Sequence, residues 1–321
     1  MKKKKEEKAM PVSSTIHGGV NHKASDRVEK VAHGIFITCA FAAVLAVVSI
    51  SLYMVINGVP AIVKVGLKEI LFRTVWKPTA AEPGFGIAYV ILTSLVGTLA
   101  AIIIGVPIGV GTAVFLTEIA NKKVAAIITP AVELLAGIPS VVYGLLGLLI
   151  LNPLMYKLEM YLFKDSQTHI FTGGANLISA VLVLAIMILP TVISISSSAL
   201  RAVPVSLKNA SLAVGATKIQ TITKVLLPAA KSGIVTAIIL GIGRAIGEAM
   251  AISLVSGSVV NIPLPFNSVR FLTTAIVSEM SYSQGTHRQV LFTIGLVLFV
   301  FIMIINLSLN RILKKGGTVE R

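Results

Sequence analysis

Residues 233–255 read GIVTAIILGIGRAIGEAMAISLV, an apolar run interrupted by one arginine and one glutamate, Arg244 and Glu248. The run is long enough to cross the hydrocarbon core of a bilayer, which takes about 20 helical residues. An ionisable side chain near the centre of such a helix costs about 2.5–3.5 kcal/mol on insertion scales. Both charges therefore need partners or a polar cavity, so this stretch bears on the fold class and on the candidate site together.

The composition of the whole chain agrees with a membrane environment. Of its 321 residues, 55% are hydrophobic and 13% are charged, and the mean hydropathy is +0.91. Soluble domains have about 45–50% apolar and 25% charged residues. We therefore predict an all-α membrane protein with six transmembrane helices, at about 35–56, 87–116, 131–151, 177–198, 233–256 and 290–310.

The placement of the basic residues predicts the orientation. The net charge is +15, but no basic motif is interleaved with stacking aromatic residues, so nucleic-acid binding is not expected. Lysine and arginine are more frequent in the segments that lie inside when the N-terminus is cytoplasmic, so both termini are expected in the cytoplasm. Residues 1–30 are expected to form a disordered basic tail near the lipid surface, residues 31–315 the transmembrane domain, and residues 316–321 a second tail.

The longest predicted inner loop, residues 201–231, is more regular than a tether needs to be. It contains basic but no acidic residues. Apolar residues recur with helical spacing on both sides of Gly215, a residue that permits a turn with positive φ. The pattern predicts a helix, a turn and a second helix that ends near Pro228.

Residues 209–228, NASLAVGATKIQTITKVLLP, resemble the coupling loop of ABC importer permeases, in which E-A-A is followed after three residues by G and nine residues later by I-x-L-P. The residues that match or replace this pattern are Asn209, Ala210, Ser211, Gly215, Leu227 and Pro228. Asn209 stands where the family usually has glutamate, and Ser211 replaces an alanine. The resemblance implies that the loop docks on a separate ATPase subunit. The chain has no G-x-x-x-x-G-K-[ST] motif, so ATP is expected on that partner, and no cofactor is expected in this chain.

Two interpretations of Arg244 and Glu248 remain open. Their i, i+4 spacing places them on one helical face, so they could simply neutralise each other and support packing. Alternatively, the guanidinium faces a translocation path and binds an oxyanion in bidentate fashion. A carboxylate beside it favours an anion that still carries a proton, which points to phosphate over sulfate.

Small residues indicate where helices approach each other or break. Gly243 and Gly247 lie one helical turn apart in the fifth predicted span, which favours close helix packing in lipid. In the third predicted span, Gly137, Pro139 and Ser140 interrupt the helix, and the interruption could be a gate or a packing kink.

Taken together, ELLAGIPSVVYGL, GIGRAIGEAM, VPIGVGTAVFLTE and the inner loop resemble the membrane subunits of bacterial phosphate-specific ABC importers, of the PstC type. The resemblance implies a type I importer permease in the inner membrane. It implies as partners a second permease of PstA type, an ATPase dimer of PstB type and an external phosphate-binding protein of PstS type. It also implies that Arg244 and Glu248 take part in phosphate passage.

Other functions remain possible on the residues alone. The cargo could be another oxyanion, such as sulfate, molybdate or phosphonate, and a secondary transporter would need no ATPase. An enzyme is the least expected class, because no nucleophile constellation is present. The histidines are expected to be solvated and not metal ligands; they are His17, His22, His33, His169 and His287.

Overall fold

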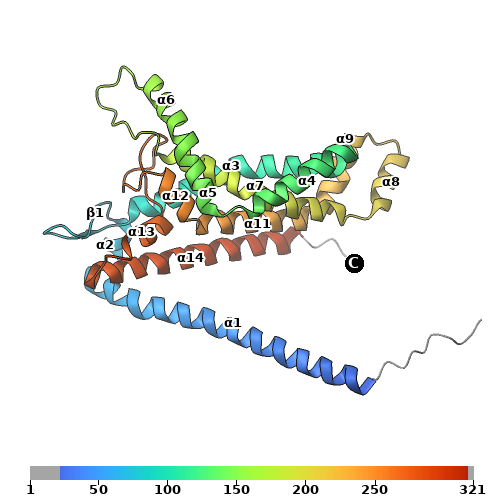
Figure 1. Ribbon diagram of the computed structural model, residues 1–321, viewed down its shortest axis with the longest axis horizontal. Helices are drawn as coiled ribbons and strands as arrows, with labels where there is room; N and C mark the ends of the chain where they lie inside the picture. Colours follow the sequence, from blue (N-terminus) through green and yellow to red (C-terminus); the bar gives the residue numbers. More distant parts are fainter. Residues whose placement is uncertain (1–21, 317–321) are drawn as a thin grey trace, which may run out of the picture. The chain divides into compact units, whose positions relative to one another are not determined.

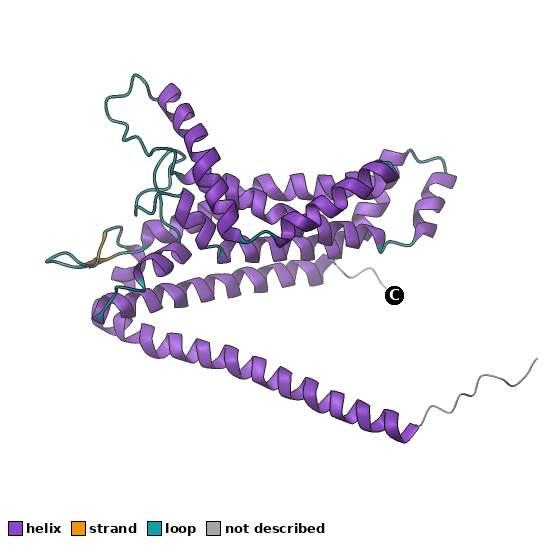
Figure 2. Cartoon of the chain, in the orientation of Figure 1, coloured by secondary structure: helices purple, strands orange, loops and turns teal. Residues whose placement is uncertain are grey.

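A computed structural model describes residues 22–316, which are almost entirely helical (Figure 2). The chain divides into two compact units, Met1–Tyr53 and Met54–Arg321, which are described separately. The first unit holds most of the long helix α1, His22–Val65. Between Val31 and Tyr53, large hydrophobic side chains of α1 are exposed, as expected of a helix surrounded by lipid, whereas the C-terminal part of α1 belongs to the second unit and has Ala61 buried there. The helix begins within the predicted tail 1–30, whose first 21 residues lie outside the described part.

The second unit contains the remaining elements. Its helices are α2 Leu67–Phe72, α3 Ala88–Val114, α4 Lys122–Gly137, α5 Ser140–Leu146, α6 Asn152–Leu162, α7 Leu177–Arg201, α8 Val205–Ala213, α9 Lys218–Thr221, α10 Leu227–Ala229, α11 Lys231–Gly247, α12 Met250–Val255, α13 Leu272–Glu279 and α14 Gly285–Gly316. Short π-helical stretches continue α3 to Ile119, join α5 to α6 and join α9 to α10. Strands β1, Trp76–Lys77, and β2, Gly84–Phe85, pair antiparallel with Trp76 opposite Phe85.

The lengths and apolar character of the helices confirm a protein that crosses the membrane several times. Within residues 22–316, five helices can span a bilayer on their own: Glu29–Val65, Ala88–Ile119, Ser140–Leu162, Leu177–Arg201 and Gly285–Ser308. A sixth is counted when Lys218–Ala229 and Lys231–Gly247, which are bent by 70° at their junction, are taken as one span.

Two predicted spans differ from the helices observed. The third, predicted at 131–151, is divided between α4, which ends at Gly137, and a membrane-length helix that begins at Ser140. The fifth, predicted at 233–256, is divided into α11 and α12 by two non-helical residues. Apolar residues continue across both breaks. Hydropathy alone therefore predicts one continuous helix in each place where the structure has two helices.

Helix α7 is the centre of the second unit. It packs against α3 and α11, and it is the most buried of the candidate membrane spans. Glycines make the approach of α3 possible: a Cβ added at Gly105 would lie 2.7 Å from Ile188 Cδ1, and one at Gly109 would lie 2.7 Å from Val192 Cγ1. Larger residues there would push the two helices apart.

Within this unit, the short elements gather at the two ends of the long helices (Figure 1). Helices α8 and α9 lie at one end, and β1, α2 and α13 lie at the other. The candidate site therefore divides into a pathway region between the ends, an inner-loop region at the α8 end, and a pocket at the β1 end.

Candidate functional site

The pathway region is built around the break between α11 and α12. Helix α11 ends at Gly247, Glu248 is extended with φ −73° and ψ 128°, and α12 begins at Met250. Backbone that is not helical is tolerated at membrane depth only where it is buried in protein or lines a water-filled cavity. Part of the backbone is satisfied here, because the Thr273 hydroxyl donates a hydrogen bond of 2.6 Å to the Glu248 carbonyl oxygen.

Arg244 lies in the last turn of α11 and is half-buried. One of its Nη atoms donates to the Thr191 hydroxyl on α7 at 3.2 Å. A guanidinium has five N–H donors, so the contact with Thr191 fixes the group and leaves donors for a ligand. Among the described side chains, no carboxylate lies within ion-pair distance of Arg244.

Glu248 has a different local role from the one its spacing suggests. The helix ends between Arg244 and Glu248, so they do not share a helical face, and the simple i, i+4 ion pair is not formed. Instead, Glu248 Oε1 accepts a hydrogen bond of 2.9 Å from the Ala251 backbone N–H at the start of α12. Glu248 is half-buried, and its second carboxylate oxygen can accept a hydrogen bond from a ligand.

The glycines around Arg244 divide between two faces of α11. Gly241 and Ala245 are buried against the chain's own helices, with Val192 near Gly241. Gly243 and Gly247 are exposed, and a Cβ added at either would meet nothing within 4 Å. The face that carries Gly243, Gly247 and the helix break is therefore left uncovered by the described residues of this chain.

The break at Gly137, Pro139 and Ser140 lies next to this region. Helix α4 ends at Gly137, Ile138 and Pro139 are extended, and α5 starts at Ser140. The Tyr143 hydroxyl on α5 donates 2.7 Å across the break to the Leu135 carbonyl oxygen. Tyr143 belongs to the same buried cluster as Ala245, so the break is tied to α11 by packing.

The inner loop forms a helix, a turn and a second helix. Gly215 has φ +87°, in the left-handed region, and its N–H donates to the Leu212 carbonyl oxygen at the end of α8. Thr217 caps α9, forming a reciprocal capping box with Gln220. The hydroxyls of Ser211 and Thr221 lie 3.0 Å apart and connect the two arms.

This loop is anchored on one side and open on the other. Ile222 and Leu226 are buried with Ala113 and Leu200, and Lys208 Nζ lies 2.6 Å from Glu118 Oε2. Exposed hydrophobic residues of the open side are Val205, Leu207, Leu212, Val214 and Ile219. Asn209, Ala210, Gly215 and Pro228 are exposed as well, whereas Ser211 and Leu227 are half-buried.

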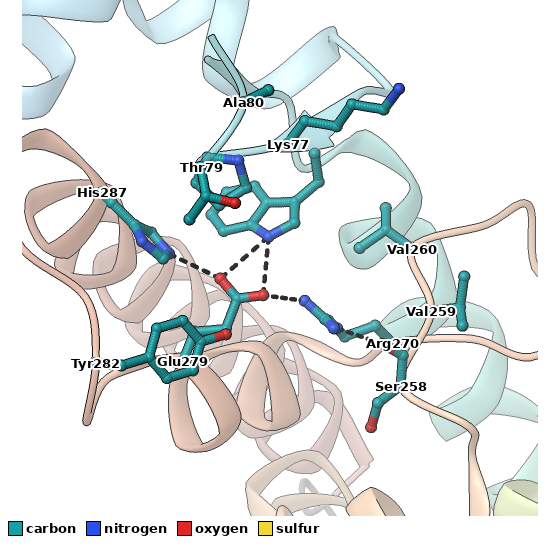
Figure 3. A pocket seen from close by; sticks show the side chains of 12 residues that line it. Lys77, Thr79, Ala80, Ser258, Val259, Val260, Arg270, Glu279, Tyr282 and His287 are labelled. Atoms are coloured by element: carbon teal, nitrogen blue, oxygen red, sulfur yellow. Dashed lines mark hydrogen bonds and ion pairs between the residues drawn. The ribbon is translucent and has the colours of Figure 1, made fainter. Parts of the chain in front are cut away.

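A pocket of about 590 Å³ at the β1 end was not found by sequence reasoning (Figure 3). Its centre is Glu279, a buried carboxylate at the end of α13. Its oxygens accept from Trp76 Nε1 at 3.1 and 3.2 Å, contact His287 Nε2 at 2.7 Å and pair with Arg270. Burial, with Glu279 as a smaller contribution, raises the pKa of the nearby Tyr282 phenol.

The prediction that His287 is solvated is wrong, because this ring is 7% exposed and contacts Glu279. His169 is similarly held, 2.8 Å from the buried Glu159. The sequence signal was weak, because the partners of Glu279 come from three separate segments. Within the described residues, no cluster of three metal-ligating side chains is found.

Comparison with known proteins identifies the family. A family model described as "Binding-protein-dependent transport system inner membrane component" matches residues 105–316. The chain belongs to this permease family. It is therefore a multi-pass protein of the bacterial inner membrane and a component of a binding-protein-dependent transport system.

Individual relatives agree with this assignment. The permease is 36% identical to a probable ABC transporter permease protein, YqgH, of Bacillus subtilis, over 91% of this chain and 94% of the relative. It is 34% identical to the phosphate transport system permease protein PstC of Pasteurella multocida, over 76% of this chain and 78% of the relative. Among solved structures, an inward-facing MetNI methionine ABC transporter matches 72% of this chain and 94% of its own, with a TM-score of 0.51 and 21% identity, which shows a shared fold.

Proposed function

We propose that this permease passes inorganic phosphate from an external binding protein to the cytoplasm, driven by ATP hydrolysis on a partner subunit. In this proposal both termini are cytoplasmic, the α8 end of the second unit is the inner end, and the β1 end is the outer one. The transmembrane domain is residues 31–315, and the coupling loop is residues 201–231.

The observation that supports the proposal most is the surroundings of Arg244. A guanidinium at a helix break, held by Thr191 and without a carboxylate partner among the described side chains, retains donors for an anion. The uncovered face of Gly243 and Gly247 leaves space beside it. A cation placed beside irregular backbone in a membrane helix is typical of a substrate pathway and is costly in a purely structural role.

Phosphate is favoured as the cargo for two reasons. Several curated relatives, from Pasteurella multocida and Haemophilus influenzae among others, are named phosphate transport system permease proteins. In addition, the second carboxylate oxygen of Glu248 can accept a hydrogen bond from the hydroxyl of hydrogen phosphate, whereas sulfate at neutral pH has no hydroxyl that can donate.

The partners are proposed because curated relatives are named PstC, and the open surfaces of this chain are assigned to them. We assign the exposed apolar side of the coupling loop to an ATPase dimer of PstB type. Hydrophobic side chains that lie outside the membrane are expected to be buried against a partner protein. The Gly243–Gly247 face is assigned to a second permease of PstA type, and the outer end to a phosphate-binding protein of PstS type. The chain itself has no phosphate-binding loop motif, so ATP belongs to the partner.

The proposal is tested by purification of the complex and reconstitution into liposomes. We expect an ATPase and a second permease to co-purify, and uptake of labelled phosphate to need external binding protein and internal ATP. Excess unlabelled sulfate should not compete. Uptake without any ATPase would favour a secondary transporter, and competition by sulfate, molybdate or phosphonate would move the assignment to another oxyanion.

A further inference from the structure

A second cavity, separate from the Arg244 region, lies between α4 and α7 near the C-terminal end of α7. Its volume is about 90 Å³, and its polar lining residues are Thr129, Glu133, Ser194, Ser197, Ser198 and Arg201. We refer to it as the inner pocket. A cavity of this volume has room for several water molecules, and hence for a small tetrahedral oxyanion.

Two hydroxyls of the inner pocket are not used by the fold, whereas the Ser198 hydroxyl donates to the Ser194 carbonyl oxygen at 2.9 Å. The side-chain oxygens of Thr129 and Ser197 are enclosed and have no hydrogen-bond partner among the described residues. A buried polar atom without a partner destabilises the fold, so a ligand or water is needed to satisfy it. Both hydroxyls can donate to an anionic oxygen.

The charged groups of the inner pocket are also free. Arg201 and Glu133 line the same cavity, yet neither forms an ion pair with another side chain in the described part of the chain. The pocket thus repeats the chemistry at Arg244 and Glu248: one guanidinium that donates and one carboxylate that accepts. Hydrogen phosphate presents the matching groups, three acceptor oxygens and one hydroxyl.

A polar face of α7 connects the two regions. Thr191, which holds Arg244, is followed at intervals of three or four residues by Ser194, Ser198 and Arg201, so these side chains lie on one face of the helix. None of the four is buried in the chain's own core. At 1.5 Å per residue, the face runs roughly 15 Å from Thr191 to Arg201.

We propose that the inner pocket is an exit site that binds the oxyanion between Arg244 and the cytoplasm, with Arg201 and the hydroxyls of Thr129 and Ser197 as donors and Glu133 as the acceptor. The proposal rests on the proposed phosphate-import function and its orientation. In this proposal the polar face of α7 supplies hydrogen-bond donors along the route from Arg244 to Arg201. The anion therefore moves from one guanidinium to the other without contacting only apolar side chains.

Uptake kinetics in the reconstituted complex give the first test. Arg201→Gln should lower the maximal uptake rate about tenfold and leave the KM for external phosphate unchanged, because entry and the Arg244 site are intact. Lys123→Gln, which removes a charge from the exposed start of α4 outside the pocket, is the matched control and should transport normally. Equal maximal rates for Arg201→Gln and the control would overturn the proposal.

Thiol protection gives a test that does not need transport. In a Cys39→Ser background, Ser198→Cys places a thiol at the pocket, and inside-out vesicles without nucleotide expose the inner end. Millimolar inorganic phosphate should slow its reaction with a small anionic thiol reagent at least threefold, and Arg201→Gln should abolish the effect. No protection, or protection that survives Arg201→Gln, would overturn the proposal. Protection by sulfate and not phosphate would support the site and contradict the phosphate assignment.

Discussion

Thr191 is the residue on which the position of Arg244 depends. Its hydroxyl is the hydrogen-bond partner of the guanidinium, and a hydrogen bond to a charged group contributes about 1.5–3 kcal/mol when it is well formed. The contact is 3.2 Å long, so we expect the lower part of that range. Thr191→Val keeps the shape and removes the acceptor, and should reduce uptake of labelled phosphate roughly tenfold.

The hydroxyl-retaining variant Thr191→Ser is the control for that prediction. It should transport within about twofold of the wild type, because serine offers the same acceptor. If both variants transport equally, Thr191 does not position Arg244, whatever their absolute rate.

Glu279 is the residue that joins the segments at the β1 end of the second unit. It is 5% exposed and holds Trp76, Arg270 and His287, which come from β1, the loop before α13, and α14. Removal of one partner from a buried charged network costs about 3–5 kcal/mol, because the remaining charge is unpaired. Glu279→Ala should therefore lower the thermal unfolding midpoint of the purified complex and expose the loops at the β1 end to protease.

The exposed acid Glu82 provides the comparison for Glu279. Glu82→Ala removes the same functional group from a loop at the same end and should leave the unfolding midpoint within about 1 °C, since a surface change usually alters stability by less than 0.5 kcal/mol. An equally small effect of Glu279→Ala would show that the cluster does not hold the outer end together.

At the scale of elements, Gly215 sets the shape of the turn in residues 201–231, the proposed coupling loop. Its φ of +87° costs a residue with a Cβ about 1–2 kcal/mol, although a Cβ would meet no other atom. That energy corresponds to a 5–30-fold shift between the observed turn and other conformations. Gly215→Val should therefore reduce phosphate-linked ATP hydrolysis of the complex by about that factor.

Gly111→Ala is the matched control, because Gly111 also has open space but lies within helix α3. It should hydrolyse ATP at the wild-type rate. Normal phosphate-linked hydrolysis in Gly215→Val would mean that the turn does not determine how the loop docks on its ATPase.

The elements also show how far a sequence can be interpreted. Hydrophobic runs predicted the membrane helices, and the spacing around Gly215 predicted the turn, because both signals are local. The break at Glu248 is only partly local: the Glu248 side chain accepts a hydrogen bond from Ala251, three residues on, but its carbonyl oxygen accepts one from Thr273, which is 25 residues away. The pocket around Glu279 depends on Trp76, which is 203 residues away in the sequence. The contact between these two side chains therefore could not be inferred from the sequence around either of them.

At the scale of the whole molecule, the described part of the second unit presents open surfaces of different kinds. The α8 end presents exposed hydrophobic side chains, and the α11 face presents glycines beside the helix break. Neither surface is complete in a single chain. The family to which the permease belongs accounts for this, since a component of a transport system has faces that other subunits cover.

The central claim is that Arg244 binds the transported anion, and labelled phosphate uptake by the reconstituted complex with Arg244→Gln tests it most directly. We expect uptake at least 100-fold below the wild type with the ATPase and second permease still co-purifying, and partial activity in Arg244→Lys, which keeps the charge but not the bidentate geometry. Normal uptake by a fully assembled Arg244→Gln complex would contradict the account.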